Sequence, residues 1–273
     1  MHLVYVALFA AVLIAGFAIP VRTSANPADT APDRSISAVS LNLAKETDPN
    51  RVLRDLRLAP RLRSADLFLF QEVVGHDTSP SVAEGIARML GFYCSFAPAA
   101  RGVHDQGLSV VSRYPITEVR ITRLKPCDLG FRSRSRFAIS AKLHTPWGGV
   151  RVWNVHLDTR VNAGERLEQL QPVIDDASQH CGPILIGGDF NTNELYWLRN
   201  VAPFPGGPSH SQTIRDAMRQ HGFESPLASG LNTFPSFRRH LDWVFTRALT
   251  PLRSSVEPAA FSDHNAVWIR VRL

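Results

Sequence analysis

The feature that most constrains the fold of this chain is the alternation of short strand-like segments with helical ones. The strand-like segments cover residues 35–43, 66–70, 107–112, 136–143, 150–157, 183–187, 241–246 and 266–271. Helical spacing of apolar residues is clearest over 163–180 and weaker over 50–64 and 81–90. Hairpin-like strand pairs mix with strand–helix–strand units in one composition regime, so the order predicts a single α/β domain over residues 35–273.

Polar residues that can do chemistry gather where these segments begin or end. They are Asn42, Glu72, His156, Asp189, Asn191, Asp242, Asp263 and His264. Most of them end or follow a predicted strand, whereas Asp263 and His264 immediately precede the last one. Because α/β folds place their sites at strand ends on the rim of a sheet, we expect these side chains to form one site.

These residue types match the needs of phosphoester hydrolysis. A phosphodiester is anionic, and a hard divalent cation held by carboxylate and amide oxygens offsets that charge. A histidine held by a carboxylate can take a proton from attacking water. The chain carries neither a Gly-x-x-x-x-Gly-Lys phosphate loop nor a serine in a Gly-x-Ser-x-Gly turn. The pattern therefore favours metal-assisted hydrolysis over ATP use or an acyl-serine mechanism.

Seven motifs, in order, resemble those of the endonuclease/exonuclease/phosphatase superfamily. They are Leu41-Asn42, Gln71-Glu72, Gly107 to Pro115, Asn154 to Leu157, Gly187 to Asn191, Leu241 to Phe245 and Ser262 to His264. The superfamily includes deoxyribonucleases, abasic-site endonucleases, sphingomyelinases and inositol polyphosphate 5-phosphatases, and the similarity runs from about residue 36 to 271. It implies a metal-dependent phosphoesterase with a four-layer α/β sandwich, in which two packed mixed β-sheets are flanked by helices.

The resemblance also implies a metal site made of Asn42, Glu72 and Asp263. Glu72 would be the principal Mg²⁺ ligand, with Asn42 and Asp263 completing the shell through waters. Mn²⁺ is the alternative cation, since it also takes oxygen ligands.

The catalytic set that the resemblance implies consists of His156, Asp189, Asn191, Asp242 and His264. His264 would act as general base or as phosphate stabiliser, oriented by Asp242. Asp189 would orient water or protonate the leaving group. His156 and Asn191 would contact the substrate phosphate, and the division between acid and base stays open at this point.

Arg136 is a further predicted phosphate ligand and ends a basic run. Residues 132–136 read Arg-Ser-Arg-Ser-Arg, and the net charge of +6 favours anionic partners. We therefore expect nucleic acid as the substrate and a nuclease of low sequence specificity, because phosphate contacts position a strand without reading its sequence. The alternatives are a phospholipid or sphingolipid phosphodiesterase that takes a lipid headgroup, a phosphatase, and an inactive binding protein. No protein partner follows from the sequence, and we expect a monomer.

Neighbouring polar residues receive structural interpretations. Asn154 would pair strand ends, and Asp158 would be either a turn residue or part of the site rim. Arg166 and Gln169, on the long helix, would support the strand end near Asp158. None of the four is counted among the predicted catalytic residues.

The N-terminus reads as an export signal. Residues 3–19 are apolar throughout, and Thr23-Ser24-Ala25 precedes Asn26, so we expect cleavage of a signal peptide over 1–25 and a disordered spacer over 26–34. An uncleaved membrane anchor is the alternative, because the usual Lys or Arg before the apolar run is missing. Cleavage would remove one base, Arg22, and no acid, which lowers the net charge from +6 to +5. The mature protein would be periplasmic or extracellular.

The cysteines are Cys94, Cys127 and Cys181, and their spacing is not that of a metal site. In an oxidising compartment one pair could form a disulfide, and the sequence does not say which pair. Three unpaired, partly buried thiols are the alternative.

Overall fold

The computed structural model describes residues 33–75, 80–99, 107–127 and 136–273. The predicted signal peptide (1–25), nearly all of the spacer (26–34) and the arginines at 132 and 134 lie outside the described residues. Residues Arg34–Leu273 form one compact unit, which carries every element named below. Within the described residues, no helix has both the length and the apolar character needed to cross a membrane.

The first sheet has six strands, and β1 and β2 at its centre run parallel. Across the sheet the order is β12 (Thr250–Glu257), β13 (Ala266–Arg272), β1 (Ser35–Asn42), β2 (Leu67–Val73), β4 (Gly107–Ser112) and β3 (Tyr93–Ala97). All the other neighbours pair antiparallel, so the sheet is mixed.

The second sheet has five strands and also contains one parallel pair, β7 and β8. Its order is β11 (Asp242–Arg247), β8 (Ile184–Asp189), β7 (Gly148–His156), β6 (Phe137–Thr145) and β5 (Ile116–Arg123). A separate two-stranded ribbon pairs β9 (Leu195–Leu198) with β10 (Ala202–Pro205).

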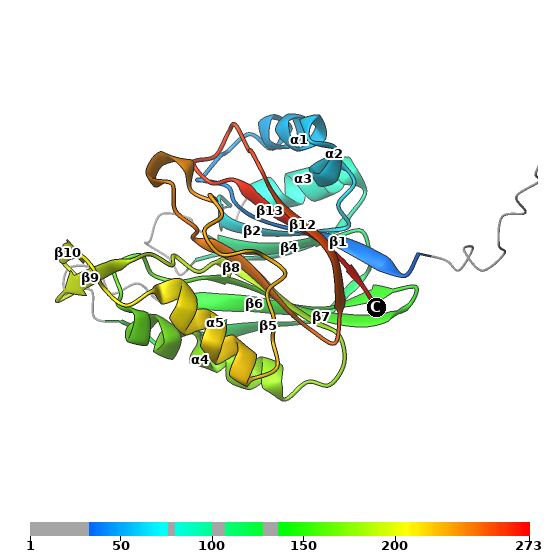
Figure 1. Cartoon of the computed structure of the whole chain (residues 1–273). Coiled ribbons are helices and arrows are strands. Elements are labelled where there is room, and N and C mark those ends of the chain that lie inside the picture. The colour runs from blue at the N-terminus through cyan, green and yellow to red at the C-terminus, as the bar shows by residue number, and fades with distance from the viewer. Residues whose placement is uncertain (1–32, 76–79, 100–106, 128–135) are drawn as a thin grey trace, which may run out of the picture. The chain divides into compact units, whose positions relative to one another are not determined.

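Helices cover the outer face of each sheet (Figure 1). The helices α1 (Pro49–Leu58), α2 (Pro60–Arg63) and α3 (Val82–Leu90) pack on the first sheet, and α4 (Ala163–Ser178) and α5 (His210–Gln220) pack on the second. Side chains alternate along β2, because Leu67 and Leu69 join the core between the sheets while Phe68 and Phe70 join the core under α1–α3. The predicted four-layer sandwich of two mixed sheets flanked by helices is confirmed.

Residues with clear local signals set the bounds of the predicted helices. Ser81 and Glu84 form a capping box at the start of α3, and Gly91 ends it in the left-handed conformation with φ +68°. Glu165 takes part in the corresponding box at the start of α4.

The strands β3, β5, β9, β10 and β12 and the helix α5 were not predicted from the sequence. Most residues of β5 and β12 are exposed, so they lack the apolar alternation by which a half-buried strand is recognised. The helix α5 does carry a signal, since Ser209 caps it through the amide of Gln212 and its buried Ile214 and Met218 are four residues apart.

The parallel pairs explain why the polar residues converge. Asn42 lies beside Gln71 at the carboxyl ends of β1 and β2, and His156 lies beside Asp189 at the carboxyl ends of β7 and β8. β11 is antiparallel to β8, so its first residue, Asp242, pairs with Asp189. Both sheets thus deliver side chains to the same rim.

Candidate active site

Seven of the predicted residues line one pocket of about 290 Å³. They are Asn42, Glu72, His156, Asp189, Asn191, Asp263 and His264. Asp242 is fully buried and contacts His264 from behind. Arg136 is not among the residues that line the pocket.

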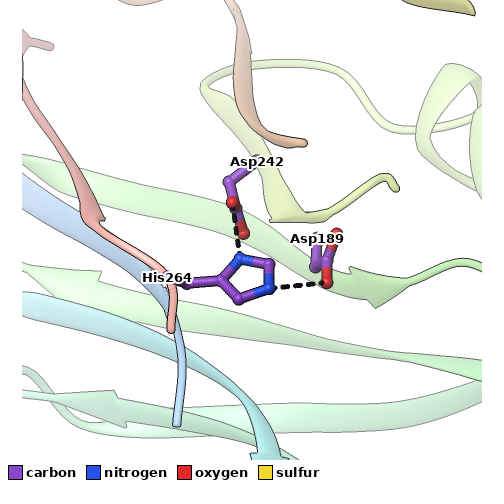
Figure 2. Close-up of side chains that lie close together, drawn as sticks. All are labelled: Asp189, Asp242 and His264. Atoms are coloured by element: carbon purple, nitrogen blue, oxygen red, sulfur yellow. Dashed lines mark hydrogen bonds and ion pairs between the residues drawn. The ribbon is translucent and has the colours of Figure 1, made fainter. Parts of the chain in front are cut away.

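His264 lies between two carboxylates (Figure 2). Its Nδ1 is 2.8 Å from Oδ2 of Asp242, and its Nε2 is 3.8 Å from Oδ2 of Asp189. The backbone amide of His264 donates to Oγ of Ser262 at 3.0 Å, which holds the turn before β13. The arrangement fixes the ring, with Nδ1 toward Asp242 and Nε2 toward the pocket.

The buried charges shift the proton equilibria of this group. Burial alone lowers the pKa of His264, but the carboxylates of Asp242 and Asp189 outweigh it and raise that pKa to about 10. Burial, together with the charge of Asp242, raises the pKa of Asp189 to about 7. A protonated His264 can donate to a phosphate oxygen, and Asp189 has a pKa suited to proton transfer near neutral pH. A divalent cation beside these carboxylates would lower both pKa values, because it stabilises the deprotonated forms.

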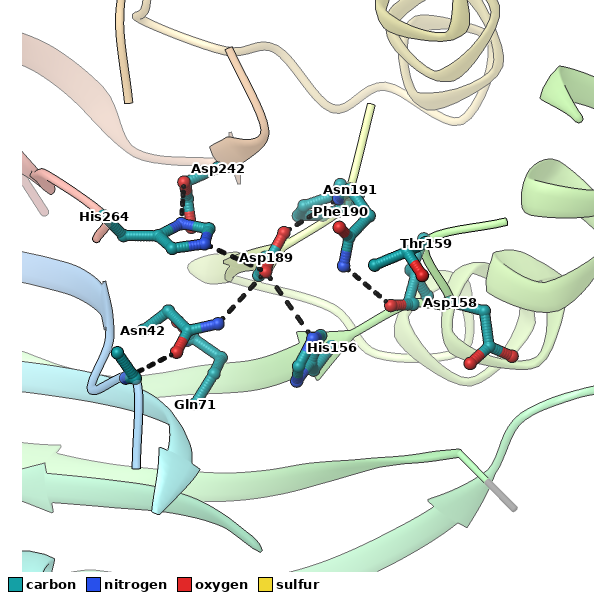
Figure 3. Close-up of polar contacts among 12 residues, drawn as sticks. Asn42, Gln71, His156, Asp158, Thr159, Asp189, Phe190, Asn191, Asp242 and His264 are labelled. Atoms are coloured by element: carbon teal, nitrogen blue, oxygen red, sulfur yellow. Dashed lines mark hydrogen bonds and ion pairs between the residues drawn. The ribbon is translucent and has the colours of Figure 1, made fainter. Parts of the chain in front are cut away.

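Asp189 is the hub of the polar contacts (Figure 3). Its Oδ2 accepts a hydrogen bond from Nδ2 of Asn42 at 3.2 Å and lies 3.5 Å from Nε2 of His156. Its Oδ1 accepts from the backbone amide of Asn191 at 2.9 Å. The side chain of Asn191 donates in turn to the carbonyl of Leu157 at 2.9 Å. Residues from both sheets are therefore joined through one carboxylate.

The backbone is unusual at two of the predicted residues. Glu72 has φ +51° and lies where the pairing of β2 with β4 shifts register, and Asn191 has φ +52°. Left-handed conformations are uncommon for residues other than glycine, and bulges of this kind re-aim side chains beside active sites. Gly188 allows the close approach of β8 to β7, because a Cβ there would lie 2.0 Å from the carbonyl oxygen of Val155.

Arg136 is held by Asp158 instead of lining the pocket. Its Nε lies 2.8 Å from Oδ1 of Asp158, whose Oδ2 accepts from Gln169 at 2.7 Å. Both partners of this ion pair are largely buried, with side-chain exposures of 11% and 2%. The role of Arg136 as a phosphate ligand therefore stays a prediction. Asp158 is buried and binds Arg136 and Gln169, so it is more than a turn residue.

Arg166 supports the two loops that leave β7 and β8. It is fully buried, and its Nη1 donates to the carbonyls of Asp158 at 2.6 Å and Phe190 at 2.8 Å. Its Nε is 3.3 Å from Nδ1 of His210, which can accept because burial, reinforced by Arg166 itself, lowers the pKa of His210 to about 4. The structural interpretation of Arg166 agrees with these contacts.

Asn154 joins the two sheets. Its Nδ2 donates to the carbonyls of Phe70 and Ser109 in the first sheet at 2.8 and 2.9 Å. Its Oδ1 accepts from Nε2 of Gln71 at 2.7 Å. These buried bonds join the two sheets, so Asn154 has a structural role. It bonds across the sheets, whereas the sequence predicted that it would pair strand ends.

The donor set of the pocket fits a divalent cation. The carboxylates of Glu72, Asp189, Asp242 and Asp263 meet at this rim, and Arg239 is the one Arg or Lys in the pocket lining. Such an excess of negative charge repels an anionic ester unless a cation offsets it. Single ligand atoms of Asp189, Asp242 and His264 lie within 4.8 Å of one another and form a possible metal group. Nδ1 of His264 already bonds to Asp242, and Glu72, Asn42 and Asp263 stay the predicted ligands.

One wall of the pocket was missed by the sequence analysis. Phe234, Phe237, Arg239 and Trp197 line it. The rings of Phe234 and Phe237 stack at 5.7 Å with 6° between their planes, and the ring of Phe234 is 4.9 Å from that of His264. Trp197 lies on the short strand β9, and Phe234, Phe237 and Arg239 lie in and around a three-residue 3-10 helix, so elements this short gave no periodic signal for them.

All three cysteines are unpaired. Burial raises the pKa of the Cys94 thiol to about 12 and that of Cys127 to about 11, so both thiols are protonated at neutral pH. Cys181 is exposed. The structure therefore agrees with the alternative of three free thiols.

The chain matches a known family over most of its length. The model of the Endonuclease/Exonuclease/phosphatase family matches residues 39–264. A UPF0294 protein of Yersinia enterocolitica is 29% identical over 102 residues, which is 37% of this chain and 34% of the relative. The chain thus matches about a third of the length of that curated relative.

Three solved structures share the fold. An endonuclease/exonuclease/phosphatase of Beutenbergia cavernae superposes with a TM-score of 0.66 at 18% identity, covering 88% of this chain and 72% of that one. The human nocturnin catalytic domain with bound sulfate gives 0.63 at 16% identity, covering 88% and 94%. D. rerio TDP2 complexed with a single-strand DNA product gives 0.59 at 15% identity, covering 88% and 100%.

Proposed function

The chain belongs to the endonuclease/exonuclease/phosphatase family of hydrolytic phosphoesterases, and on that premise we propose an exported, Mg²⁺-dependent nuclease of low sequence specificity. The observation that carries this proposal is the carboxylate-rich pocket in which His264 lies between Asp242 and Asp189. Bound Mg²⁺ would neutralise the phosphate and polarise its oxygens, and Glu72, Asn42 and Asp263 would hold it.

The remaining side chains act on the phosphate and on protons. Nε2 of His264 points into the pocket and donates to a phosphate oxygen when the ring is protonated, or takes a proton from water when it is not. Asp242 holds the ring in either state. Asp189 orients the water or protonates the leaving oxygen, and Asn42, His156 and the Asn191 amide hold its carboxylate in place. His156 and Asn191 complete the contacts to the phosphate.

Nucleic acid is the proposed substrate class for two reasons. The mature chain would carry a net charge of +5 after loss of Arg22, and a polyanion gains from such charge by counterion release. The TDP2 structure contains a single-strand DNA product, and it shares the fold of this chain. A zwitterionic lipid headgroup gains much less from positive charge.

The substrate is tested by comparing esters in one magnesium buffer. The purified protein should cut DNA or RNA with little base preference and should lose this activity in excess chelator. Release of phosphocholine from sphingomyelin, with DNA and RNA left intact, would establish the lipid alternative. No turnover of any ester, including bis(p-nitrophenyl) phosphate, would indicate an inactive binding protein.

Export predicts a shortened N-terminus. The apolar run over 3–19 and the Thr23-Ser24-Ala25 sequence place the expected cleavage just before Asn26. Mass spectrometry of protein from the native cell envelope or medium should find Asn26 at or near the first position. Recovery of intact Met1 would instead support a membrane anchor.

A further inference from the structure

A second pocket of about 290 Å³ lies directly beside the active-site pocket. Asn193 and Arg239 line both pockets, so the two are neighbours on the same rim. Its wall consists of residues 192–195, the start of α5 and the segment before β11. The two pockets differ in charge, because carboxylates dominate the first and arginines the second.

Three arginines, Arg215, Arg238 and Arg239, line this second pocket, which we call the basic pocket. Glu194 is the one acid in its lining, and it accepts a hydrogen bond from Oγ of Ser209 at 2.9 Å. Among the described residues, none of the three arginines forms an ion pair with a carboxylate. Arg215 and Arg239 are partly buried and Arg238 is exposed, and guanidinium groups without a counter-charge favour an anionic ligand.

Two of the three arginines lie over aromatic rings. The guanidinium of Arg215 lies over the ring of Trp243 at 5.8 Å, and that of Arg239 lies over Phe237 at 5.5 Å. His240 forms part of the same lining and stacks on Trp243 at 3.8 Å. Rings that orient the planar guanidinium groups reduce the entropy lost when an anion binds.

The N-terminus of α5 adds backbone donors to the basic pocket. This helix has 11 residues, and Ser211 and Gln212 of its first turn line the pocket. Ser209 satisfies the amide of Gln212 and the carbonyl of Asn193 that of His210, so the Ser211 amide and the helix dipole are what this end of the helix offers an anion. Guanidinium forks combined with helix amides are the donors that phosphate oxygens accept best.

We propose that the basic pocket binds a second phosphate of the substrate, namely the phosphate next to the scissile one in a nucleic-acid strand. This inference rests on the proposed nuclease function and names the strand geometry that the site selects. A strand places one phosphate in the acidic pocket, where the reaction occurs, and a neighbouring phosphate against the arginines. A substrate with a single phosphate uses only the first pocket.

Dinucleotides that differ by one phosphate test the proposal. The full-length protein should hydrolyse either pTpT or TpTp about tenfold more efficiently than TpT, as measured by kcat/KM. Arg215→Gln and Arg238→Gln together should reduce that preference by about tenfold. Arg219→Gln is the matched control, because this arginine lies on the same helix, is exposed, and pairs with Asp216 outside the pocket.

A binding measurement separates the basic pocket from the chemistry. In a His264→Ala background, the affinity for fluorescent oligothymidine should fall with rising KCl. The double substitution Arg215→Gln and Arg238→Gln should reduce the magnitude of the slope of log K against log [KCl] by about 0.7, because the basic pocket holds one phosphate of a single strand. Arg219→Gln should leave this slope unchanged.

Several outcomes would overturn the proposal. Equal efficiency on TpT, pTpT and TpTp would remove the second phosphate subsite, as would an unchanged preference in the double variant. An equal loss of this preference in Arg219→Gln would show that the overall positive charge, and not the basic pocket, produces it. If the double variant lost binding to phosphatidic acid vesicles while its salt slope with oligothymidine stayed that of the parent, the basic pocket would be assigned to a lipid phosphate. Failure to hydrolyse bis(p-nitrophenyl) phosphate contradicts the proposed function alone, since the binding slope still tests the pocket.

Discussion

His264→Ala and Asp242→Asn should each lower kcat on a phosphodiester by about 10³-fold. The 2.8 Å contact between His264 Nδ1 and Asp242 Oδ2 makes the imidazole and the carboxylate one unit. Asn at position 242 keeps the shape and an acceptor oxygen but removes the charge that outweighs burial at His264. Steady-state kinetics with bis(p-nitrophenyl) phosphate and with an oligonucleotide measures both losses.

The double variant provides the sharper measurement. When two residues act as a unit, removing both costs little more than removing either one. We therefore expect the double variant to be within about threefold of His264→Ala. Asp216→Asn, an equivalent change on the exposed surface of α5, is the control and should keep wild-type rates. Losses that multiply in the double variant would show that His264 and Asp242 act independently.

Local signals were sufficient to predict a single α/β domain, because most of the buried strands carry them, whereas the four-layer sandwich was predicted from the family resemblance. β8, with its uninterrupted apolar start, and α4, with its apolar face, are recognisable from spacing alone. The polar rim follows, since residues after such strands meet at one edge of a sheet. β12 was not predicted because five of its eight residues are exposed, and it is a strand because it pairs with β13.

The contacts within the site needed the structure. Asp242 and His264 are 22 residues apart, and only the family resemblance suggested that they pair. Nothing in the sequence indicated that Arg136 bonds to Asp158, because a long side chain can reach several partners. The arginines of the basic pocket come from α5 and from the segment before β11, and only the tertiary packing brings them together.

Glu72→Gln should lower kcat by about 10² to 10³-fold at saturating substrate and raise the Mg²⁺ concentration for half-maximal activity by about tenfold or more. The substitution keeps size and shape but removes one of the negative charges that the cation offsets. Glu168→Gln, exposed and paired with Lys125 on the surface, removes the same charge elsewhere and should change neither value.

The Mg²⁺ titration also decides between the two sets of ligands at this rim. If Glu72, Asn42 and Asp263 hold the cation, Glu72→Gln shifts the titration and Asp242→Asn lowers the rate without shifting it. If instead Asp189, Asp242 and His264 hold it, the shift follows Asp242→Asn, and the bond between Asp242 and His264 belongs to a metal site and not to proton transfer. Unchanged activity in Glu72→Gln, or wild-type turnover in excess chelator, would contradict the metal assignment altogether.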